Sequence, residues 1–407
     1  MKSYSTYLAE AKNTHMEHIE DMMFNEGKSG ALKAMKFLRD LRDNLESGST
    51  KAVNSTVKWD GAPAIIAGID PEDGKFFVGA KGVFAKTPKT IKSHDDITKH
   101  GYSGGLAEKL KTAFDNLKGI ITDGVYQGDI MFSKGDVNTE KIDGESYYTF
   151  HPNTIVYAVP TNSPLGAKIN SSNIGIVWHT TYTGDSLANM SASFGKDIAT
   201  KMKDSPSVWT ADAMYHDASG TATFTAKETK ELDAILKKAE GSLSKIKGNI
   251  LETIAADTQV RNLVKSYNNS YVRKGTPFPK VRSHVAGLYR HIKQWFEKEE
   301  GKRKSPAGKK KVKDKKTDAI QKVFSDVKNL LPVFETFNYL TQAKMLVVAK
   351  MNKAASMKTF VKTSKGFKIT NPEGYVAIGN DDAVKIVDRW EFSFNNFSPT
   401  ILKGWEK

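Results

Sequence analysis

A lysine that could act as a nucleophile lies in the segment Lys58-Trp59-Asp60-Gly61. A lysine amine attacks an electrophile only when it is deprotonated, and nearby cations and partial burial lower its pKa toward that state. Gly61 lets the backbone turn tightly beside a bound ligand. The segment alone is weak evidence for such chemistry, because Asp-Gly pairs are ordinary turn sequences.

Five further segments with charged, aromatic or glycine residues follow in order along the chain. They are Gly79-Ala80-Lys81-Gly82, Gly128-Asp129-Ile130-Met131, Ile155-Val156-Tyr157-Ala158, Glu373-Gly374-Tyr375-Val376 and Val384-Lys385-Ile386-Val387. Most of them contain apolar runs that are typical of short strands. Agreement of the whole order is harder to explain by chance than any one segment.

This order resembles that of the covalent nucleotidyltransferases, which include DNA ligases, RNA ligases and mRNA capping enzymes. The resemblance implies that Lys58 is the residue that becomes adenylylated, that Asp60 belongs to the same catalytic set, and that Gly61 lies beside the nucleotide. Lys81 and Asp129 would hold the ribose and the nearby phosphate.

The same resemblance implies roles for the later segments. Tyr157 would stack on the adenine. Glu373 would help to bind a metal ion or orient the nucleophile, and Lys385 would neutralise charge on the α-phosphate as it is attacked. Structural interpretations stay open for several of these residues: Lys81 as a solvated strand lysine, Asp129 as a turn cap, Tyr157 as a core residue and Glu373-Gly374 as a plain turn.

The sequence departs from the family pattern at several points. The fifth motif of the family has two lysines separated by one residue, whereas this chain has Val387 at the second position. Arg389 is the candidate that would supply the missing charge. Lys81 stands where many ligases have arginine, and a lysine cannot grip a phosphate with two parallel hydrogen bonds. The chain also leaves no room for an OB domain after Arg389, which looks more like the phage RNA ligases. The whole sequence is similar to uncharacterised proteins of tailed marine phages.

Composition bounds the possible functions. The chain has 407 residues and a formal net charge of +15, which favours a polyanionic partner, either nucleic acid or an anionic membrane surface. The absence of cysteine excludes disulfides, thiolate nucleophiles and cysteine-based zinc sites. His151, His179 and His216 are scattered rather than spaced as ligand pairs. A polar N-terminus and the lack of a long apolar segment predict a soluble, cytoplasmic protein that does not enter a membrane.

The spacing of apolar residues predicts an α+β fold. Residues 1–48 are predicted to be a helical segment, with three-residue spacing of Leu32, Met35, Leu38 and Leu41. Residues 49–190 and 366–407 carry short β-like runs separated by Gly, Asp and Pro. We assign these two ranges to one nucleotidyltransferase core of antiparallel sheets.

Residues 191–365 are predicted to be a mostly helical, basic insertion in that core. Thr225 and Glu228 form a capping-box pattern that predicts the start of a helix. In Lys302–Lys316, nine of fifteen residues are Lys or Arg, and Ser305, Pro306 and Gly308 interrupt the run. We interpret it as an exposed, mobile loop. Its lysines are predicted to contact nucleic-acid phosphates, namely Lys309, Lys310, Lys311 and Lys313.

The sequence therefore predicts an ATP-dependent polynucleotide ligase that acts through a lysyl-AMP intermediate. ATP is the expected co-substrate, with Mg²⁺ or Mn²⁺ neutralising the phosphates and Glu373 as the candidate metal residue. RNA or nicked DNA is the expected partner, with RNA slightly favoured. Two alternatives are a catalytically altered protein that binds nucleotide or nucleic acid on a ligase scaffold, and nucleotidyl transfer to another acceptor.

Overall fold

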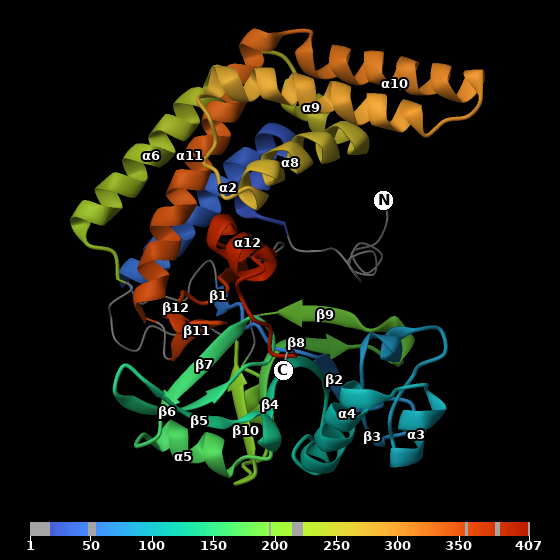
Figure 1. The fold of residues 1–407 in the computed structure, drawn as a ribbon, viewed down its shortest axis with the longest axis vertical. Helices are drawn as coiled ribbons and strands as arrows, with labels where there is room; N and C mark the ends of the chain where they lie inside the picture. Colours follow the sequence, from blue (N-terminus) through green and yellow to red (C-terminus); the bar gives the residue numbers. More distant parts are fainter. Residues whose placement is uncertain are drawn as a thin grey trace.

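Helices form one end of the molecule and β-sheets form the other, as Figure 1 shows for the computed structural model of the chain. The structure describes residues 17–47, 54–194, 197–213, 223–354, 357–378 and 383–405; the remaining parts of the predicted ranges, and His216, lie outside these residues. The predicted α+β class is confirmed, with antiparallel sheets and a helix near the N-terminus. Within the described ranges, no helix combines the length and apolar character needed to cross a bilayer.

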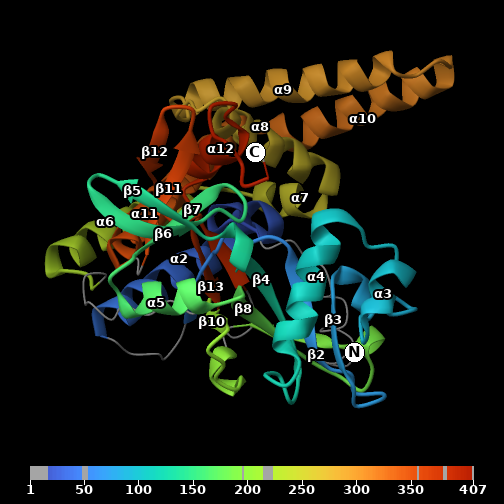
Figure 2. The ribbon, with the colours of Figure 1, turned by 60° about the horizontal axis from the view of Figure 1, so that its bottom comes forward.

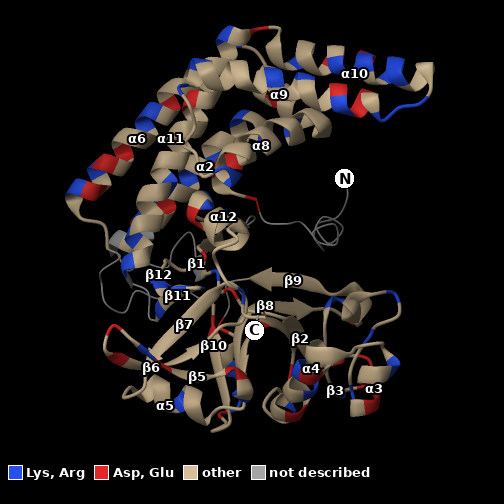
Figure 3. Cartoon of the chain, viewed as in Figure 1, with Lys and Arg blue, Asp and Glu red and all other residues tan. Residues whose placement is uncertain are grey.

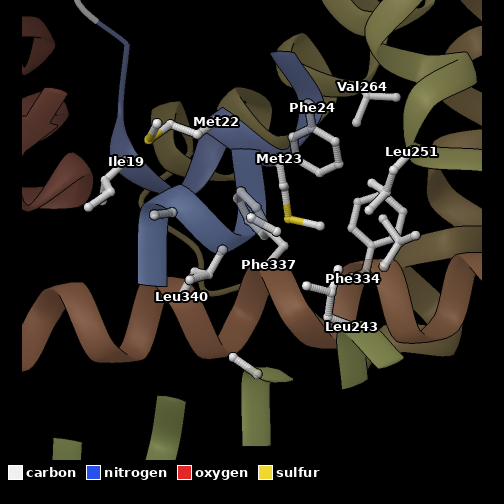
Figure 4. Packing of buried hydrophobic residues seen from close by; sticks show 14 of the residues in the cluster. Ile19, Met22, Met23, Phe24, Leu243, Leu251, Val264, Phe334, Phe337 and Leu340 are labelled. Atoms are coloured by element: carbon white, nitrogen blue, oxygen red, sulfur yellow. The ribbon is translucent and has the colours of Figure 1, made fainter. Parts of the chain in front are cut away.

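A bundle of helices shares the largest hydrophobic core of the molecule. Its members are α2 (Met22–Ser47), α6 (Ala226–Ser244), α7 (Ile250–Ala256), α8 (Thr258–Arg273), α9 (Val281–Gly301), α10 (Pro306–Phe324) and α11 (Val327–Met351). Figure 4 shows Phe24 of α2 among Phe334 and Phe337 of α11, and the Phe24 and Phe337 ring centroids are 5.4 Å apart. The N-terminal helix is therefore part of the helical bundle rather than a separate unit.

The local signals for two of these helices can be tested directly. Thr225 is the N-cap of α6 and exchanges hydrogen bonds with Glu228, which confirms the predicted capping box. In α2, Met35, Leu38 and Leu41 are buried, but Leu32 is 55% exposed. Three-residue steps drift by about 60° on a helix of 3.6 residues per turn, so Leu32 lies on the opposite side from Leu41.

The larger of the two main sheets has helices on one face. Its strand order is β10 (Val208–Asp212), β8 (Ile174–Thr183), β4 (Val125–Ser133), β2 (Ala64–Ile69) and β3 (Phe76–Gly79), with β9 (Ser191–Phe194) paired to β8. All pairs are antiparallel except β10 with β8. Helices α3 (His94–Lys99) and α4 (Gly104–Leu117) cover one face, where Phe114 belongs to the same core cluster as Trp178.

A second sheet packs on the other face of the first. Its strand order is β12 (Gly366–Ile369), β11 (Lys358–Thr363), β7 (Ile155–Pro160), β6 (Glu145–Phe150) and β5 (Asn138–Ile142), and α5 (Pro164–Ser171) lies against it. One apolar cluster joins the two sheets and includes Phe132 of β4, Phe150 of β6 and Trp209 of β10. This packing makes the β end a two-sheet structure with its own core.

A small third sheet connects the β end to the helical bundle. It has the order β1 (Asn54–Val57), β13 (Tyr375–Ile378) and β14 (Ala383–Ile386), and α12 (Arg389–Phe397) follows it. Tyr375, Ala377 and Ile386 belong to the core of the helical bundle. The chain leaves this sheet through Lys58 and enters the larger sheet at β2.

The edges of the helical insertion differ from the predicted boundaries at 191 and 365. Strands β9 and β10 pair within the larger sheet, and β11 pairs with β7, so the described helices of the insertion run from 226 to 351. These strands are short and lie beside long helices. Strands of four to six residues show too few alternations of apolar and polar residues to be recognised, so they were included in the helical range beside them.

The basic run Lys302–Lys316 does not form the predicted loop, because most of it is helix α10. Ser305 is the N-cap and accepts a hydrogen bond from the Gly308 N–H, and Pro306 occupies the first turn. Val312, Ala319 and Val323 are buried in the bundle core. Lysine is a good helix former, and capping and packing decided the structure of this segment.

A cluster of buried charges joins the start of the described chain to α11 and α12. The Lys344 Nζ lies 2.7 Å from the Glu20 Oε1, and both side chains are completely buried. The Arg389 Nη1 lies 3.2 Å from both Glu20 and Asp21. Burial alone would raise the pKa of Glu20, but Lys344 and Arg389 lower it to about 2. Glu20 is therefore ionised at neutral pH, whereas burial raises the pKa of Asp21 and lowers that of Lys344.

We predict that Lys344→Met destabilises the protein by about 3–5 kcal/mol, because it leaves Glu20 buried with less compensating charge. The matched control is Lys328→Met, which removes an exposed lysine from the same helix and should change stability by less than about 0.5 kcal/mol. Urea denaturation followed by circular dichroism measures both. Equal unfolding midpoints for the two variants would contradict the coupling.

Candidate active site around Lys58

The three-stranded sheet brings together residues that are far apart in the sequence. Val57 pairs with Tyr375, and the Lys58 N–H donates to the Gly374 carbonyl at 2.8 Å. On the other side of β13, Val376 pairs with Lys385. Lys58, Glu373 and Lys385 therefore lie at one end of this sheet.

The Lys58 ammonium forms an ion pair with the Glu373 carboxylate. The Glu373 side chain is only 7% exposed, whereas that of Lys58 is 28% exposed and so reachable from solvent. The Lys58 Nζ also lies 5.6 Å from the centroid of the Phe392 ring. Burial raises the pKa of Glu373 to about 7; the Lys58 ammonium opposes this shift, while Asp60 and Asp129 add to it.

Lys385 supplies a second cation to this site. Burial lowers its pKa, and the Lys58 ammonium lowers it further, while Glu373 and Glu17 act in the opposite direction. The Lys385 N–H donates to the Glu17 carbonyl at 2.8 Å, which fixes the strand beside the charge cluster. Two lysines and one buried carboxylate thus share a small volume, an arrangement suited to binding and transferring an anionic group.

The Asp60 carboxylate is fully engaged in hydrogen bonds from backbone and side-chain donors. This is a structural role, whereas a catalytic role was predicted. It is 4% exposed. One carboxylate oxygen accepts from Asn153 at 2.6 Å, and the other accepts from the backbone N–H groups of Thr154 and Ile155 at 2.6 and 2.8 Å. Asp60 therefore anchors the Lys58 loop to the turn before β7.

Tyr157 does not offer a face to a base, so its predicted stacking role is not supported. Its side chain is 3% exposed, with its ring stacked on Phe150 at 5.4 Å and tilted against Trp59 at 5.2 Å. The Tyr157 hydroxyl accepts from the Asp60 N–H at 2.8 Å. Alternation along β7 turns positions 155, 157 and 159 toward the facing sheet, which places Tyr157 in the core between the sheets.

Gly61 and Asp129 lie against each other, as the candidate nucleotide site requires. A Cβ atom on Gly61 would lie 2.5 Å from the Asp129 Cβ, so only glycine fits there. The Asp129 side chain is 22% exposed, and its Oδ2 lies 3.9 Å from the His179 Nε2. Asp129 is thus available to a ligand at the mouth of the site.

His179 is a site residue that the sequence did not identify. In the pairing of β4 with β8, Gln127 faces Thr180 and Gly128 faces Trp178, so His179 is the extra residue of a β-bulge. Bulges redirect side chains and are common beside active sites. No residue pattern marks this bulge in the sequence, although the composition of Trp178-His179-Thr180-Thr181-Tyr182 is unusual for the core strand that it predicts.

Lys81 is exposed in a single 3-10 turn, Lys81–Phe84, directly after β3. Gly79 at the end of β3 pairs with Ile66 near the start of β2. Ala64 at the start of β2 pairs with Asp129. The topology therefore places Lys81 at the edge of the sheet where the Lys58 loop enters. The alternative interpretation of Lys81, as a solvated lysine without a ligand, also stays open.

Arg389 does not compensate for Val387 in the fifth motif. Arg389 is buried in ion pairs with Glu20 and Asp21, away from the exposed face of the site. Val387 is 2% exposed. A Cβ atom added to Gly374, whose φ is +143°, would lie 2.5 Å from the Cγ2 of Val387. Val387 is a packing residue beneath the Glu373-Gly374 turn, so Lys385 is the cation that this motif provides.

The four lysines predicted to contact nucleic acid are not part of this site. Lys309, Lys310, Lys311 and Lys313 are exposed on α10, which forms a projecting hairpin with α9, and Figure 3 shows basic residues along it. Acidic residues of α9 balance part of this charge: the Lys313 Nζ lies 3.5 Å from Glu300, and the Lys316 Nζ lies 3.9 Å from Glu297. Among the described residues, Lys309, Lys310 and Lys311 have no carboxylate partner within 4.0 Å.

The carboxylate of Glu373, the predicted metal ligand, forms an ion pair with Lys58. In the described ranges, no group of three or more His, Asp or Glu side chains is arranged to hold a metal ion.

Comparison with known proteins gives a family. No curated protein and no solved structure matches the chain. A protein-family profile described as "Family of unknown function (DUF6267)" matches residues 13–400, which include every site residue described above. The chain therefore belongs to this family, DUF6267.

Proposed function

We propose that this protein is an ATP-dependent polynucleotide ligase with a ligase-type nucleotidyltransferase core, in which Lys58 becomes covalently adenylylated and RNA is slightly favoured over DNA. One observation carries the proposal: the Lys58 amine pairs with the buried Glu373 carboxylate, next to Lys385, at one end of a sheet. The order of the matched sequence segments supports it independently.

In the first step, the Lys58 Nζ lone pair would form a bond to the α-phosphorus of ATP. The bond from that phosphorus to the bridging oxygen breaks, and pyrophosphate leaves with the electron pair. Glu373, with a pKa of about 7, is placed to accept one proton from the Lys58 ammonium and so free the lone pair, and a second N–H proton passes to solvent once the nitrogen–phosphorus bond has formed. Lys385 would stabilise negative charge on the α-phosphate. Mg²⁺ or Mn²⁺, when bound, would neutralise the phosphates.

The nucleotide would then pass to a polynucleotide. A 5′-phosphate oxygen attacks the phosphorus of lysyl-AMP, the phosphorus–nitrogen bond breaks, and Lys58 recovers its proton. A 3′-hydroxyl next attacks the 5′-phosphate, AMP leaves, and the hydroxyl proton passes to solvent. Lys81, Asp129 and Gly61 are our candidates for holding the nucleotide, with His179 orienting Asp129.

A second candidate function follows from Val387. Because Val387 packs under Gly374 and Arg389 is held in buried ion pairs, the fifth motif has one lysine instead of two. A protein altered in this way would bind nucleotide or nucleic acid without sealing it. Labelling by ATP separates this candidate from an enzyme, and labelling without sealing of ends would favour nucleotidyl transfer to another acceptor.

We predict that ATP labelled in the α-phosphate, with magnesium, leaves label on the denatured chain, and that Lys58→Ala abolishes it. Lys58→Arg should also abolish labelling while keeping the charge beside Glu373, because a guanidinium is not deprotonated in proteins. The control Lys99→Ala changes an exposed lysine of α3 and should label normally. Full labelling of a folded Lys58→Ala variant would exclude Lys58 as the nucleophile.

We predict that the labelling rate rises with pH and levels off above about 7, because Glu373 accepts the amine proton only when ionised. Glu373→Gln should lower the rate by about 100-fold or more and remove this rise. Glu108→Gln, at an exposed position of α4, is the control. Single-turnover rates between pH 5 and 9 test the assignment; an unchanged profile in Glu373→Gln would assign the titration to another group.

We predict that replacing Lys309, Lys310, Lys311 and Lys313 with alanine weakens nucleic-acid binding and flattens its salt dependence. Each lost phosphate contact should reduce the slope by roughly 0.7–0.9 log units per log unit of salt. Labelling of Lys58 should persist, since that step needs no polynucleotide. The control replaces Lys227, Lys230, Lys237 and Lys238, four exposed lysines of α6, and has the same charge change. Equal slopes of affinity against salt concentration in the two variants would show that the hairpin lysines do not contact nucleic acid.

A further inference from the structure

Large aromatic side chains are exposed near the C-terminal end of the described chain. Phe394 is 51% exposed, Phe397 is 73% exposed and Trp405 is 64% exposed. Phe394 and Phe397 are three residues apart on α12 and therefore neighbours on its surface. Figure 2 shows α12, β12 and the C-terminal end of the chain close together. Clustered exposed rings mark a binding surface more often than isolated ones do.

Lysines from the β11–β12 hairpin lie beside these rings. The segment 357–372 contains Lys358, Lys362, Lys365 and Lys368 and no acidic residue. Lys365 and Lys368 are exposed, and neither has a carboxylate partner within 4.0 Å among the described residues. The Lys368 Nζ lies 5.8 Å from the centroid of the Phe394 ring. One lysine thus lies over an exposed aromatic ring, and the same hairpin carries further exposed cations, a combination that is complementary to a polyanion that carries flat bases.

The opposite face of α12 borders the candidate active site. The Phe392 ring, on the same helix, lies 5.6 Å from the Lys58 Nζ. The Thr154 hydroxyl donates to Asn396 at 3.2 Å, and the Gly404 N–H donates to the Asn153 carbonyl at 2.7 Å. Because Asn153 and Thr154 also bind Asp60, α12 and the C-terminal turn are held beside the loop that carries Lys58.

We propose that Phe394, Phe397, Trp405, Lys365 and Lys368 form an aromatic–lysine surface that binds single-stranded nucleic acid. Bases stack on the rings, and the lysines contact the phosphates. In a duplex the bases are stacked on one another and present no free face, so this surface selects single strands. The inference rests on the proposed function in taking a polynucleotide as ligand, and it specifies unpaired ends rather than a nick in a duplex.

The test is binding of fluorescein-labelled oligo(U) and oligo(dT) of about twelve nucleotides, compared with a duplex of equal length, by fluorescence anisotropy. Phe394→Leu with Phe397→Leu keeps apolar side chains but removes the aromatic faces. It should weaken single-strand binding by about 10-fold or more and leave duplex binding unchanged. The control, Phe194→Leu with Tyr289→Leu, removes two rings that are each 41% exposed on β9 and α9 and should bind like the parent.

Labelling of Lys58 by ATP separates this inference from the proposed function. Weakened single-strand binding in the α12 variant supports the surface whether or not the parent is labelled; a parent without label overturns only the proposed ligase. Unchanged single-strand binding overturns the surface, even if labelling is normal. Sedimentation at several concentrations gives the other test: a parent dimer that the α12 variant fails to form would assign the rings to a second copy of the chain and overturn the proposal.

Discussion

Glu20 is a carboxylate that water does not reach, and its compensation by Lys344 and Arg389 is the interaction on which the candidate site depends most. Lys344 belongs to α11 in the middle of the helical bundle, whereas Arg389 begins α12, a few residues after β14. The backbone beside Glu20 also binds Lys385 through the Glu17 carbonyl. A buried charge is costly unless its partners are held in place, so the bundle, β14 and α12 have one relative arrangement that satisfies it. That arrangement sets where Lys385 lies relative to Lys58.

Burial acts on the acid and the base of this site in opposite directions. It raises the pKa of Glu373 and lowers the pKa of Lys385, because in both cases it disfavours the charged form. Both groups therefore titrate closer to neutrality than they would in water. A carboxylate with a pKa of about 7 beside a lysine can hold the amine in place and also take its proton. The Glu373-Gly374 turn and the packing of Val387 beneath it maintain this environment.

The sequence predicted much of the fold class and the set of residues at the site, but fewer of their roles. Thr225 with Glu228 was readable because a cap is a local interaction, and Lys58, Glu373 and Lys385 were readable as members of an ordered motif set. Asp60 and Tyr157 were assigned to chemistry, yet both are buried in the packing of the Lys58 loop, which depends on contacts from a different sheet. His179 owes its position to a bulge, and α10 is a helix through capping and burial against distant segments. Each of these outcomes depends on tertiary neighbours that no local pattern contains.

The pairing of Val57 with Tyr375 spans roughly 300 residues of sequence, and helices α6 to α11 of the bundle lie between the two strands in the chain. Contacts at such separation form late, since closing a long loop costs chain entropy before the pairing repays it. A nascent chain that has completed only its first half contains Lys58 but lacks Glu373 and Lys385, the carboxylate and the second cation of the site. Assembly of the candidate site is thereby coupled to completion of the fold, and a truncated or half-folded chain would hold Lys58 without its charged neighbours.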